Sequence, residues 1–321
     1  RRARGDDMFA FEAKGDTVLD RGIGEHVSEQ GGRSGLAVLS GNLDAFAARA
    51  LAARAAGRSL DLMYYYWKDD LTGRLLAQEI VKAADRGVRV RLLLDDINTQ
   101  GKDRIYLSMD SHPNIYVRLF NPSRARRKGL RRGLEMALRA LSVTRRMHNK
   151  AWIADGQLAI VGGRNIGDEY FDAAQISNFR DIDMLLAGPV VQEVEQVFDA
   201  FWNSEVTMPI DVLVRARKPK LDRLRANLAE AATAKSAQPY VRQAMERVSL
   251  MVMFNSLLPV NWTTAVRIVA DPPEKALNRN SENWIMATLL PVIASAERSI
   301  AITSPYFVPG TEGVALLTGM A

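Results

Sequence analysis

The sequence has 321 residues, of which 47% are hydrophobic and 25% are charged, and these values exclude a disordered chain and indicate a folded globular protein. It contains no cysteine, which excludes disulfides and thiolate metal sites, and no apolar run approaches the ~18–20 residues that cross a bilayer. The net charge of +6 is unevenly placed, because eleven Lys and Arg side chains and one acid lie between residues 118 and 150, and such a field favours an anionic membrane or a nucleic acid as partner.

Helices and strands alternate along most of the chain after a polar, glycine-rich start, residues 1–34, which we expect to be loosely ordered. Apolar spacings of three and four predict helices, and short apolar runs between turn residues predict strands. In chain order we predict helix 43–56, strand 59–67, helix 71–85, strand 88–94, helix 102–111, strand 115–120, strands 150–153, 158–161 and 182–186, and helix 191–203. This order predicts an α/β fold with a mixed, mainly parallel sheet flanked by helices.

A short internal repeat with an offset of 240 residues links the two ends of the chain. Arg58–Leu62 corresponds to Arg298–Ile302, and Tyr66-Trp67 corresponds to Tyr306-Phe307, which predicts a strand over 300–306. Repetition at a fixed offset indicates two units of one kind. We therefore expect four parts, which are the lead-in 1–34, a first lobe over 35–210, a basic helical linker over 211–262 and the beginning of a second, incomplete lobe over 263–321.

The segment from Met147 to Tyr170 carries the residues that we expect to do chemistry. His148 and Lys150 are two positions apart in a strand-like run, so they lie on the same face. Phosphodiester chemistry without a metal needs a nucleophile and a fixed positive charge, because the phosphoryl oxygens repel an attacking group. We expect His148 to be the nucleophile and Lys150 to hold a non-bridging phosphate oxygen.

Glycines and an amide follow this pair and complete a predicted phosphate site. Asn165 would donate an amide hydrogen bond to the same phosphate, and Gly163 would let the backbone approach it closely. Asp155, at a predicted Asp155-Gly156 turn, is the third member of the catalytic group and would organise the site rather than touch substrate.

Asp181 is the predicted orienting residue. A nucleophilic imidazole needs an acceptor at its other nitrogen, and Asp181 can supply one, with Asp183 on the same face. The alternative for Asp181 is an ion pair with a nearby arginine such as Arg180. No group of His, Asp and Glu has metal-ligand spacing, so we expect neither a metal nor an organic cofactor.

The spacing His148-x-Lys150-x4-Asp155, followed by Gly162-Gly163-x-Asn165, resembles the HKD motif of the phospholipase D superfamily. Flanking phrases in the same order resemble one bacterial branch more narrowly, the cardiolipin synthases of the C type. These phrases are Tyr64–Trp67, Asp69–Gly73, Leu92–Asp96, Arg118–Pro122, Gly163–Phe171, Phe201–Ser204 and Ser304–Pro309. The resemblance covers residues 34–321. It implies that a phosphatidyl group passes from one phospholipid to the histidine, and then to the hydroxyl of phosphatidylglycerol, which gives cardiolipin.

The resemblance also implies two lobes with one motif each, in which the second histidine acts as general acid for the leaving alcohol. Only His148 lies in such a motif here, because His26 and His112 lack a lysine two residues later. We therefore expect that the chain stops before its second motif, and that the other histidine comes from a missing second half or from a partner copy in a homodimer.

Two other functions would use the same residues. A nuclease or other phosphodiesterase would use His148 on a nucleic acid, and a non-catalytic protein would bind lipid without turnover. The resemblance favours phospholipid substrates over nucleic acid and implies peripheral association with the bacterial inner membrane. The basic cluster Arg124–Arg132 would dock on anionic headgroups or form a solvated loop. The aromatic run Tyr64–Trp67 would line the lipid entrance or belong to the core.

Overall fold

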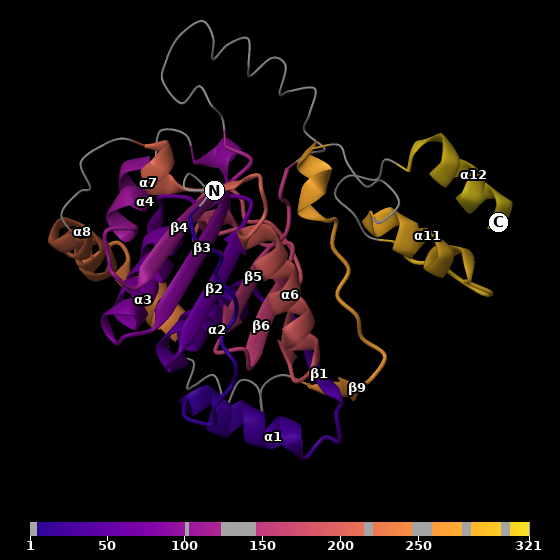
Figure 1. Cartoon of the computed structure of the whole chain (residues 1–321), viewed down its shortest axis with the longest axis horizontal. Helices are drawn as coiled ribbons and strands as arrows, with labels where there is room; N and C mark the ends of the chain where they lie inside the picture. The colour runs from indigo at the N-terminus through magenta and orange to yellow at the C-terminus, as the bar shows by residue number, and fades with distance from the viewer. Residues whose placement is uncertain are drawn as a thin grey trace, which may run out of the picture. The chain divides into compact units, whose positions relative to one another are not determined.

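A nine-stranded sheet forms the centre of the first of two units, Arg1–Ile268 and Val269–Ala321, into which the chain divides (Figure 1). The computed structural model describes residues 5–99, 103–122, 146–214, 221–245, 259–277, 284–302 and 309–320. The basic cluster Arg124–Arg132 lies outside the described residues, and so does part of the linker 211–262. The predicted docking of that cluster on headgroups therefore stays a prediction.

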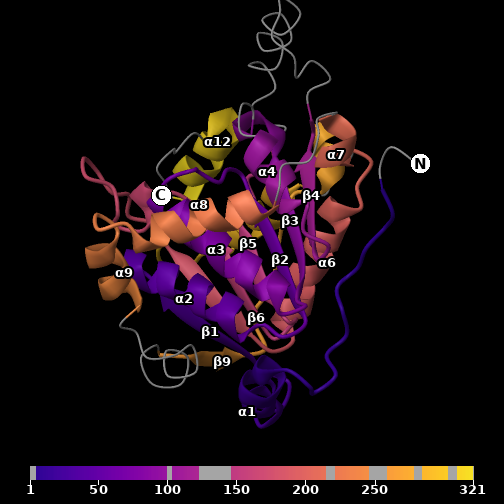
Figure 2. The same cartoon turned by 90° about the vertical axis from the view of Figure 1, so that its left-hand side faces the viewer.

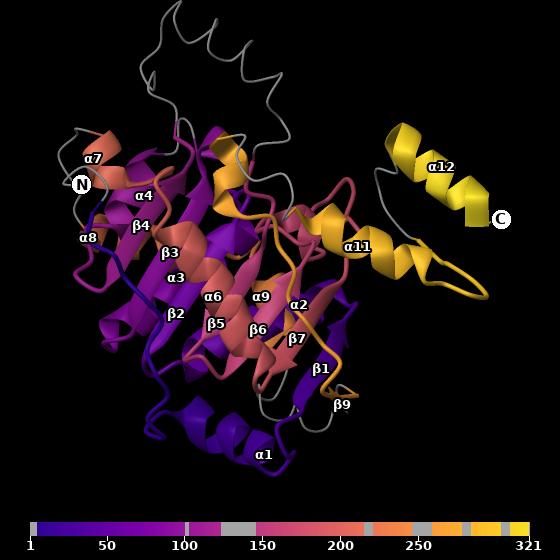
Figure 3. The same cartoon turned by 45° about the vertical axis from the view of Figure 1, so that its right-hand side comes forward.

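Across the sheet the strand order is β8-β4-β3-β2-β5-β6-β7-β1-β9, and Figure 3 shows β1 and β9 beside β7 at one edge. In chain order the strands are β1 (Ser34–Leu39), β2 (Ser59–Tyr64), β3 (Arg89–Asp95), β4 (Ile115–Phe120), β5 (Ala151–Ala154), β6 (Leu158–Gly162), β7 (Asp183–Ala187), β8 (Thr207–Pro209) and β9 (Asn261–Thr263). The strands predicted between residues 59 and 186 are all present, with ends that differ by at most three residues. Strand β1 and the short edge strands β8 and β9 were not predicted.

Helices cover both faces of the sheet, as predicted for an α/β fold. In chain order the α-helices are α1 (Glu25–Ser28), α2 (Asn42–Ala55), α3 (Leu71–Asp85), α4 (Asp103–Met109), α6 (Val190–Trp202), α7 (Ile210–Leu213), α8 (Leu221–Thr233), α9 (Gln238–Met245), α11 (Ile285–Ala294) and α12 (Gly310–Met320). Shorter turns are η1 (Asp20–Gly24), η2 (Asp96–Asn98), η4 (Asp168–Tyr170) and η6 (Pro273–Leu277). Helices α2 and α3 lie on one face, where α9 and α8 pack against them, and α6 lies on the other (Figures 1 and 2).

The sheet is mixed, as predicted, but the prediction of mainly parallel pairing is wrong. Strand β2 pairs in parallel with β3, and β3 with β4, because α3 and α4 carry the chain back between them. The other pairings among the described strands are antiparallel. Asp155 and Gly156 have positive φ values of 54° and 68°, and such a tight turn joins β5 directly to its antiparallel neighbour β6. The strand–helix–strand pattern of the first half does not continue through residues 151–187.

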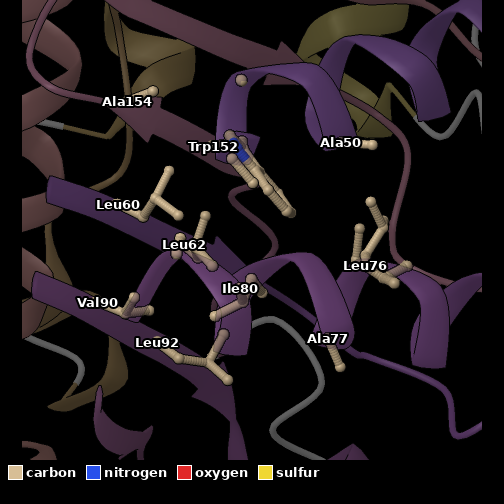
Figure 4. Close-up of a cluster of buried hydrophobic side chains, with 14 of the residues drawn as sticks. Ala50, Leu60, Leu62, Leu76, Ala77, Ile80, Val90, Leu92, Trp152 and Ala154 are labelled. Atoms are coloured by element: carbon tan, nitrogen blue, oxygen red, sulfur yellow. The ribbon is translucent and has the colours of Figure 1, made fainter. Parts of the chain in front are cut away.

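The main hydrophobic core lies between the sheet and the helices α2 and α3 (Figure 4). Alternate residues of a strand point to the same face, so one side of the central strands is apolar throughout. Leu76 and Ile80 of α3 are fully buried against this side. Full burial of one such side chain stabilises the fold by about 1.5–3 kcal/mol. The strand residues that face the helices include Leu60, Leu62, Val90, Leu92, Trp152 and Ala154.

The opposite face of the sheet, which α6 covers with buried apolar residues such as Phe198 and Trp202, buries charge as well. Arg91 of β3 pairs with Asp61 of β2 at 2.6 Å and with Asp199 of α6 at 2.7 Å. The Arg91 guanidinium also donates to the main-chain carbonyl of Met8 at 2.8 Å. The N-terminal segment is therefore fixed to the sheet and includes η1 and α1, unlike the loosely ordered lead-in that we expected. Its partners lie far away in the sequence, where local composition cannot indicate them.

The unit Val269–Ala321 contains η6, α11 and α12. Helices α11 and α12 lie at the positions that an offset of 240 residues gives for the counterparts of α2 and α3. Helix α11 buries none of its side chains, and Met286, Leu289 and Val292 are exposed on it. Residues 300–302 lie in neither a helix nor a strand, and the rest of the predicted strand, 303–306, lies outside the described residues. The four-part division of the chain stays a prediction.

Candidate phosphate-transfer site

Three neighbouring central strands, β2, β5 and β6, have ends that lie on the same side of the sheet. Strand β2 runs antiparallel to β5 with Met63 opposite Ala151, so the residues after β2 lie beside those before β5. Strand β6 ends at Gly162, which lies opposite Asp183 at the start of β7. His148 and Lys150 precede β5, while Asn165 follows β6. The sequence therefore brings its predicted nucleophile, cation and amide to the same end of neighbouring strands.

The imidazole of His148 is exposed and has an aromatic support. It stacks on the ring of Tyr65, with 4.2 Å between the ring centroids and 24° between the ring planes. Tyr65 directly follows β2, so a strand of the core fixes the position of the supporting ring. The stack limits rotation of the imidazole and leaves it accessible from solvent, as a nucleophile requires.

Lys150 supplies the positive charge next to His148. Its Nζ donates to the main-chain carbonyl of His148 and lies 5.7 Å from the centroid of the Tyr65 ring. Burial lowers the pKa of Lys150 to about 8, although the carboxylates of Asp181 and Asp183 act in the opposite direction. Lys150 therefore keeps its charge at neutral pH and loses it just above that range.

A buried carboxylate fixes the backbone immediately before His148. Asp95, at the end of β3, accepts the Met147 N–H at 3.0 Å and a bond from Arg146 at 3.3 Å. Burial raises the pKa of Asp95 to about 6, and this effect exceeds the opposing influence of Arg146. Sequence reasoning missed the role of Asp95. The available signal was an acid directly after the apolar run Leu92–Leu94, at the carboxyl end of a parallel strand.

Asn165 is held on both sides and nearly buried. Its Oδ1 accepts the Tyr66 N–H at 3.3 Å, and its Nδ2 donates to the hydroxyl of Tyr170 at 3.3 Å. An amide nitrogen carries two hydrogens, so one donor remains for a further acceptor. The amide predicted to hold phosphate is therefore oriented before any ligand binds.

Two carboxylates approach the glycines at the end of β6. A Cβ built on Gly163 would overlap the carboxylate of Asp181, and one built on Gly162 would overlap Asp183. Asp181 Oδ1 accepts the N–H of Ile182 at 2.9 Å, and its charge raises the pKa of Lys150. The structure thus places Asp181 beside Gly163 and within electrostatic reach of Lys150. The prediction that Asp181 orients His148 stays a prediction.

A buried ion network lies beneath the glycines. Asp183 pairs with Arg49 at 2.9 Å and with Arg164 at 3.3 Å, and all three side chains are almost inaccessible. Arg164 also donates to Oδ1 of Asn42 at 2.9 Å. Because Arg164 immediately precedes Asn165, this network fixes the segment that carries the amide.

Asp155 lies at the other end of β5, away from His148 and Lys150. Its fully buried carboxylate accepts the main-chain N–H groups of Gly57, Arg58 and Ser59 at 2.8–2.9 Å. The four residues of β5 separate it from Lys150. The structure therefore does not bring Asp155 to the other predicted catalytic residues. Its contacts join the β5–β6 turn to the start of β2.

Comparison with known proteins identifies the family. Residues 51–202 match the family described as "Cardiolipin synthase, PLD-like domain", and this range contains His148, Lys150, Asp155 and Asn165. Residues 51–202 of the chain form a phospholipase D-like domain of this family.

Relatives of this superfamily match most of the chain. Cardiolipin synthase C of Escherichia coli (strain K12) is 39% identical over 295 residues, which are 91% of this chain and 61% of that protein. A cardiolipin synthase of Staphylococcus aureus (strain Mu50) is 26% identical over 80% of this chain and 41% of that protein. The crystal structure of a phosphatidylserine synthase from Haemophilus influenzae aligns with 14% identity and a TM-score of 0.42 over 66% of this chain and 47% of that one. The chain spans 61% of the length of the Escherichia coli cardiolipin synthase and 41% of the length of the Staphylococcus aureus one.

The other two histidines of this phospholipase D-like chain have structural partners away from the site. His112 accepts the Asn114 N–H at 3.0 Å and lies 3.0 Å from a carboxylate oxygen of Asp85. His26 lies in α1, with its ring 5.6 Å from that of Trp262. Neither residue approaches the stacked pair His148 and Tyr65 through any contact described, in accord with their lack of a motif lysine.

The aromatic run Tyr64–Trp67 divides between the core and the phospholipase D-like site. Tyr64 and Trp67 are buried, whereas the hydroxyl of Tyr66 donates to Glu169 at 2.7 Å. Glu169 also pairs with Lys68, so a polar group of three side chains lies beside the Asn165 segment. The core role is therefore confirmed for Tyr64 and Trp67, while the predicted lipid-entrance role of the run stays a prediction. Sequence reasoning missed two residues. Tyr65 supports His148, and Glu169 binds Tyr66 and Lys68.

The described residues contain neither a metal-binding cluster nor a helix that could span a membrane. No group of three His, Asp or Glu side chains there could hold a metal ion. None of the helices in those ranges has the length and apolar character to cross a bilayer.

Proposed function

We propose that this chain carries the phosphatidyl-transfer site of a cardiolipin synthase and acts through a phosphohistidine at His148. One observation supports this most directly: an exposed imidazole stacked on Tyr65, with the Lys150 cation beside it and the oriented Asn165 amide on the next strand. Such a group can present a nucleophile and two donors to one phosphate. The first lobe over 35–210 would be the catalytic body.

In the first step a ring nitrogen of neutral His148 attacks the phosphorus of a donor phospholipid. A phosphorus–nitrogen bond forms, the bond from phosphorus to the headgroup oxygen breaks, and the leaving alkoxide takes a proton. Lys150 and Asn165 hold the non-bridging oxygens while negative charge develops on them. Gly163 lets Asp181 lie close to Lys150, and Asp181 keeps the imidazole in the reactive orientation.

In the second step the hydroxyl of phosphatidylglycerol attacks the phosphohistidine. A phosphorus–oxygen bond forms, the phosphorus–nitrogen bond breaks, and the hydroxyl proton passes to a base. The acid of the first step and the base of the second would be one further histidine. His26 and His112 are engaged elsewhere, so we propose that this histidine belongs to a second motif, in a partner copy or in a longer form of the protein.

The proposed substrates place the enzyme at a membrane. Phosphatidylglycerol and a second phospholipid reside in a bilayer, and we propose peripheral attachment at the bacterial inner membrane. The basic insert between residues 118 and 150 would add attraction to anionic lipid.

Mass spectrometry of lipid products tests the reaction. The protein is incubated with vesicles of phosphatidylglycerol and phosphatidylethanolamine, beside the variant His148→Asn. We expect cardiolipin from the wild type and a loss on the order of 10⁴-fold or more in the variant, because the covalent step is removed. Equal product from both would contradict a phosphohistidine at this residue. Cleavage of DNA by the wild type, with binding that falls steeply as salt rises, would favour a phosphodiesterase instead.

A further inference from the structure

Apolar side chains stand exposed on a loop beside the proposed site. The loop, Asp172–Ile182, joins η4 to β7 and is called here the site loop. Ile176 is 100% exposed, Ile182 is 59% exposed and Phe179 is 48% exposed. A single exposed apolar residue is common on a protein surface, but three within one short loop offer apolar area that a binding partner can bury.

Hydrogen bonds fix the tip of the site loop. The Asn178 side chain accepts the Ala174 N–H and donates to the Ala174 carbonyl, both at 3.1 Å. These two bonds close a small ring of chain that contains Ile176. The main chain of Phe179 donates to the carbonyl of Glu169 at 2.7 Å. The exposure of Ile176 therefore follows from a fixed backbone.

Asn42 at the start of α2 fixes the base of the site loop. Its Nδ2 donates to Oδ1 of Asp172 and to the carbonyl of Phe179, both at 2.8 Å. Its Oδ1 accepts from Arg164, the residue before Asn165. One buried amide thus connects the site loop to the segment that carries the phosphate-binding amide.

Both ends of the site loop meet the proposed phosphate site. Next to the first end, the ring of Tyr170 packs on that of Phe179 with 5.1 Å between the centroids, and the Tyr170 hydroxyl accepts from Asn165. At the second end, Asp181 lies against Gly163 and acts on the charge of Lys150. A surface that covers the tip would therefore lie next to the site.

We propose that the site loop inserts its apolar tip into the interface of a phospholipid bilayer and so presents the site to lipid headgroups. The inference rests on the proposed function, because it names the surface by which that site reaches its substrate. The loop has an acid near each end, Asp172 and Asp181, while residues 173–180 between them carry Arg180 and no acid, so the tip alone is cationic and suits an anionic lipid surface. Insertion would bring headgroup phosphates to Lys150 and Asn165 without removal of the acyl chains from the bilayer.

Vesicle sedimentation tests the insertion. The chain is mixed with vesicles of phosphatidylglycerol and phosphatidylethanolamine, beside Ile176→Ser and a control, Val18→Ser, which removes another exposed aliphatic side chain far from the site. Ile176 makes no contact that the fold needs, so the variant should unfold at the same urea concentration. We expect the partition coefficient of Ile176→Ser to fall about tenfold and that of Val18→Ser to stay unchanged. Equal partitioning of all three proteins would overturn the proposal and would leave a protein surface as the occupant of the loop.

A fluorescent probe gives an independent measurement. The chain has no cysteine, so Ile176→Cys and Val18→Cys each accept a single polarity-sensitive label. We expect a blue shift on addition of vesicles for the label at position 176 and none at position 18. An unshifted label at position 176 would overturn the proposal.

Monomeric substrate separates this proposal from the proposed function. If both hold, Ile176→Ser loses activity on vesicles and keeps wild-type activity on short-chain phosphatidylglycerol below its micelle concentration. If the wild type lacks transferase activity on either substrate, the proposed function fails, and the partition and probe experiments still decide whether the loop binds lipid.

Discussion

The two ends of β5 show how one motif serves two physical purposes. At one end the carboxylate of Asp155 is fully buried and accepts three main-chain hydrogen bonds. At the other end His148 is exposed and Lys150 is buried enough to lower its pKa. The end with Asp155, where the carboxylate has its hydrogen-bond partners, stabilises the sheet. The end with His148 and Lys150, called here the reactive end, carries a lysine charge whose desolvation is not fully compensated. Spacing in the sequence joins these residues, but only the strand between them shows their separate roles.

Removal of the Lys150 charge should lower activity more than any change at the buried end of β5. In Lys150→Met we expect transfer activity to fall on the order of 10²–10³-fold, as for the loss of one donor to a developing oxyanion. The urea midpoint should change little, because no ion pair is broken. A pH series with Lys150→Arg as the matched variant adds a check. The wild type should lose activity as the pH rises through about 8, and the arginine variant should keep it. Identical alkaline limbs would show that another group controls them.

Removal of the Asp155 carboxylate should act on stability alone. Asp155→Ala leaves three main-chain N–H groups without their acceptor and places alanine at a positive φ, so we expect a loss of about 3 kcal/mol in the free energy of unfolding. Activity per folded molecule should stay within about twofold. Asp155→Asn keeps an oxygen acceptor and tolerates the conformation, so it should lose about 1 kcal/mol. Urea unfolding and transfer assays check both values. A large loss of turnover in folded Asp155→Asn would contradict this prediction and would show that Asp155 contributes to catalysis.

Asp95 gives an effect on stability that depends on pH. Its folded pKa of about 6 lies above the unfolded value near 3.9, so the folded state binds more protons between these pH values. Stability from this group is therefore present below about pH 4 and is lost as the pH rises to about 6. The difference in unfolding free energy between wild type and Asp95→Asn should fall by up to about 3 kcal/mol over this window and then level off. Denaturant unfolding at pH 4, 5, 6 and 7 measures it, and a flat difference would contradict the raised pKa.

Local pattern predicted the helices and strands of the first unit well, because each has a clear apolar period. The spacing also placed His148, Lys150 and Asn165 at one sheet edge, since strand ends meet there. It failed where structure depends on distant partners. The N-terminal segment is fixed by Arg91, a contact that has no local signal. The Met147 backbone is fixed by Asp95, whose place after an apolar run marks the acid but not its distant partner. The mainly parallel sheet was wrong because a tight turn after β5 reverses the chain.

The amide of Asn42 has a thermodynamic consequence. It bonds at once to Arg164, beneath the Asn165 segment, and to the base of the site loop. Where binding at two sites is coupled through a shared contact, the coupling free energy has the same size in both directions. If a headgroup held at Asn165 tightens whatever holds the loop tip, contact at the tip must tighten the headgroup equally, and release of product would loosen the loop. Asn42 at the start of α2 is the side chain through which surface residence and site occupancy would be coupled.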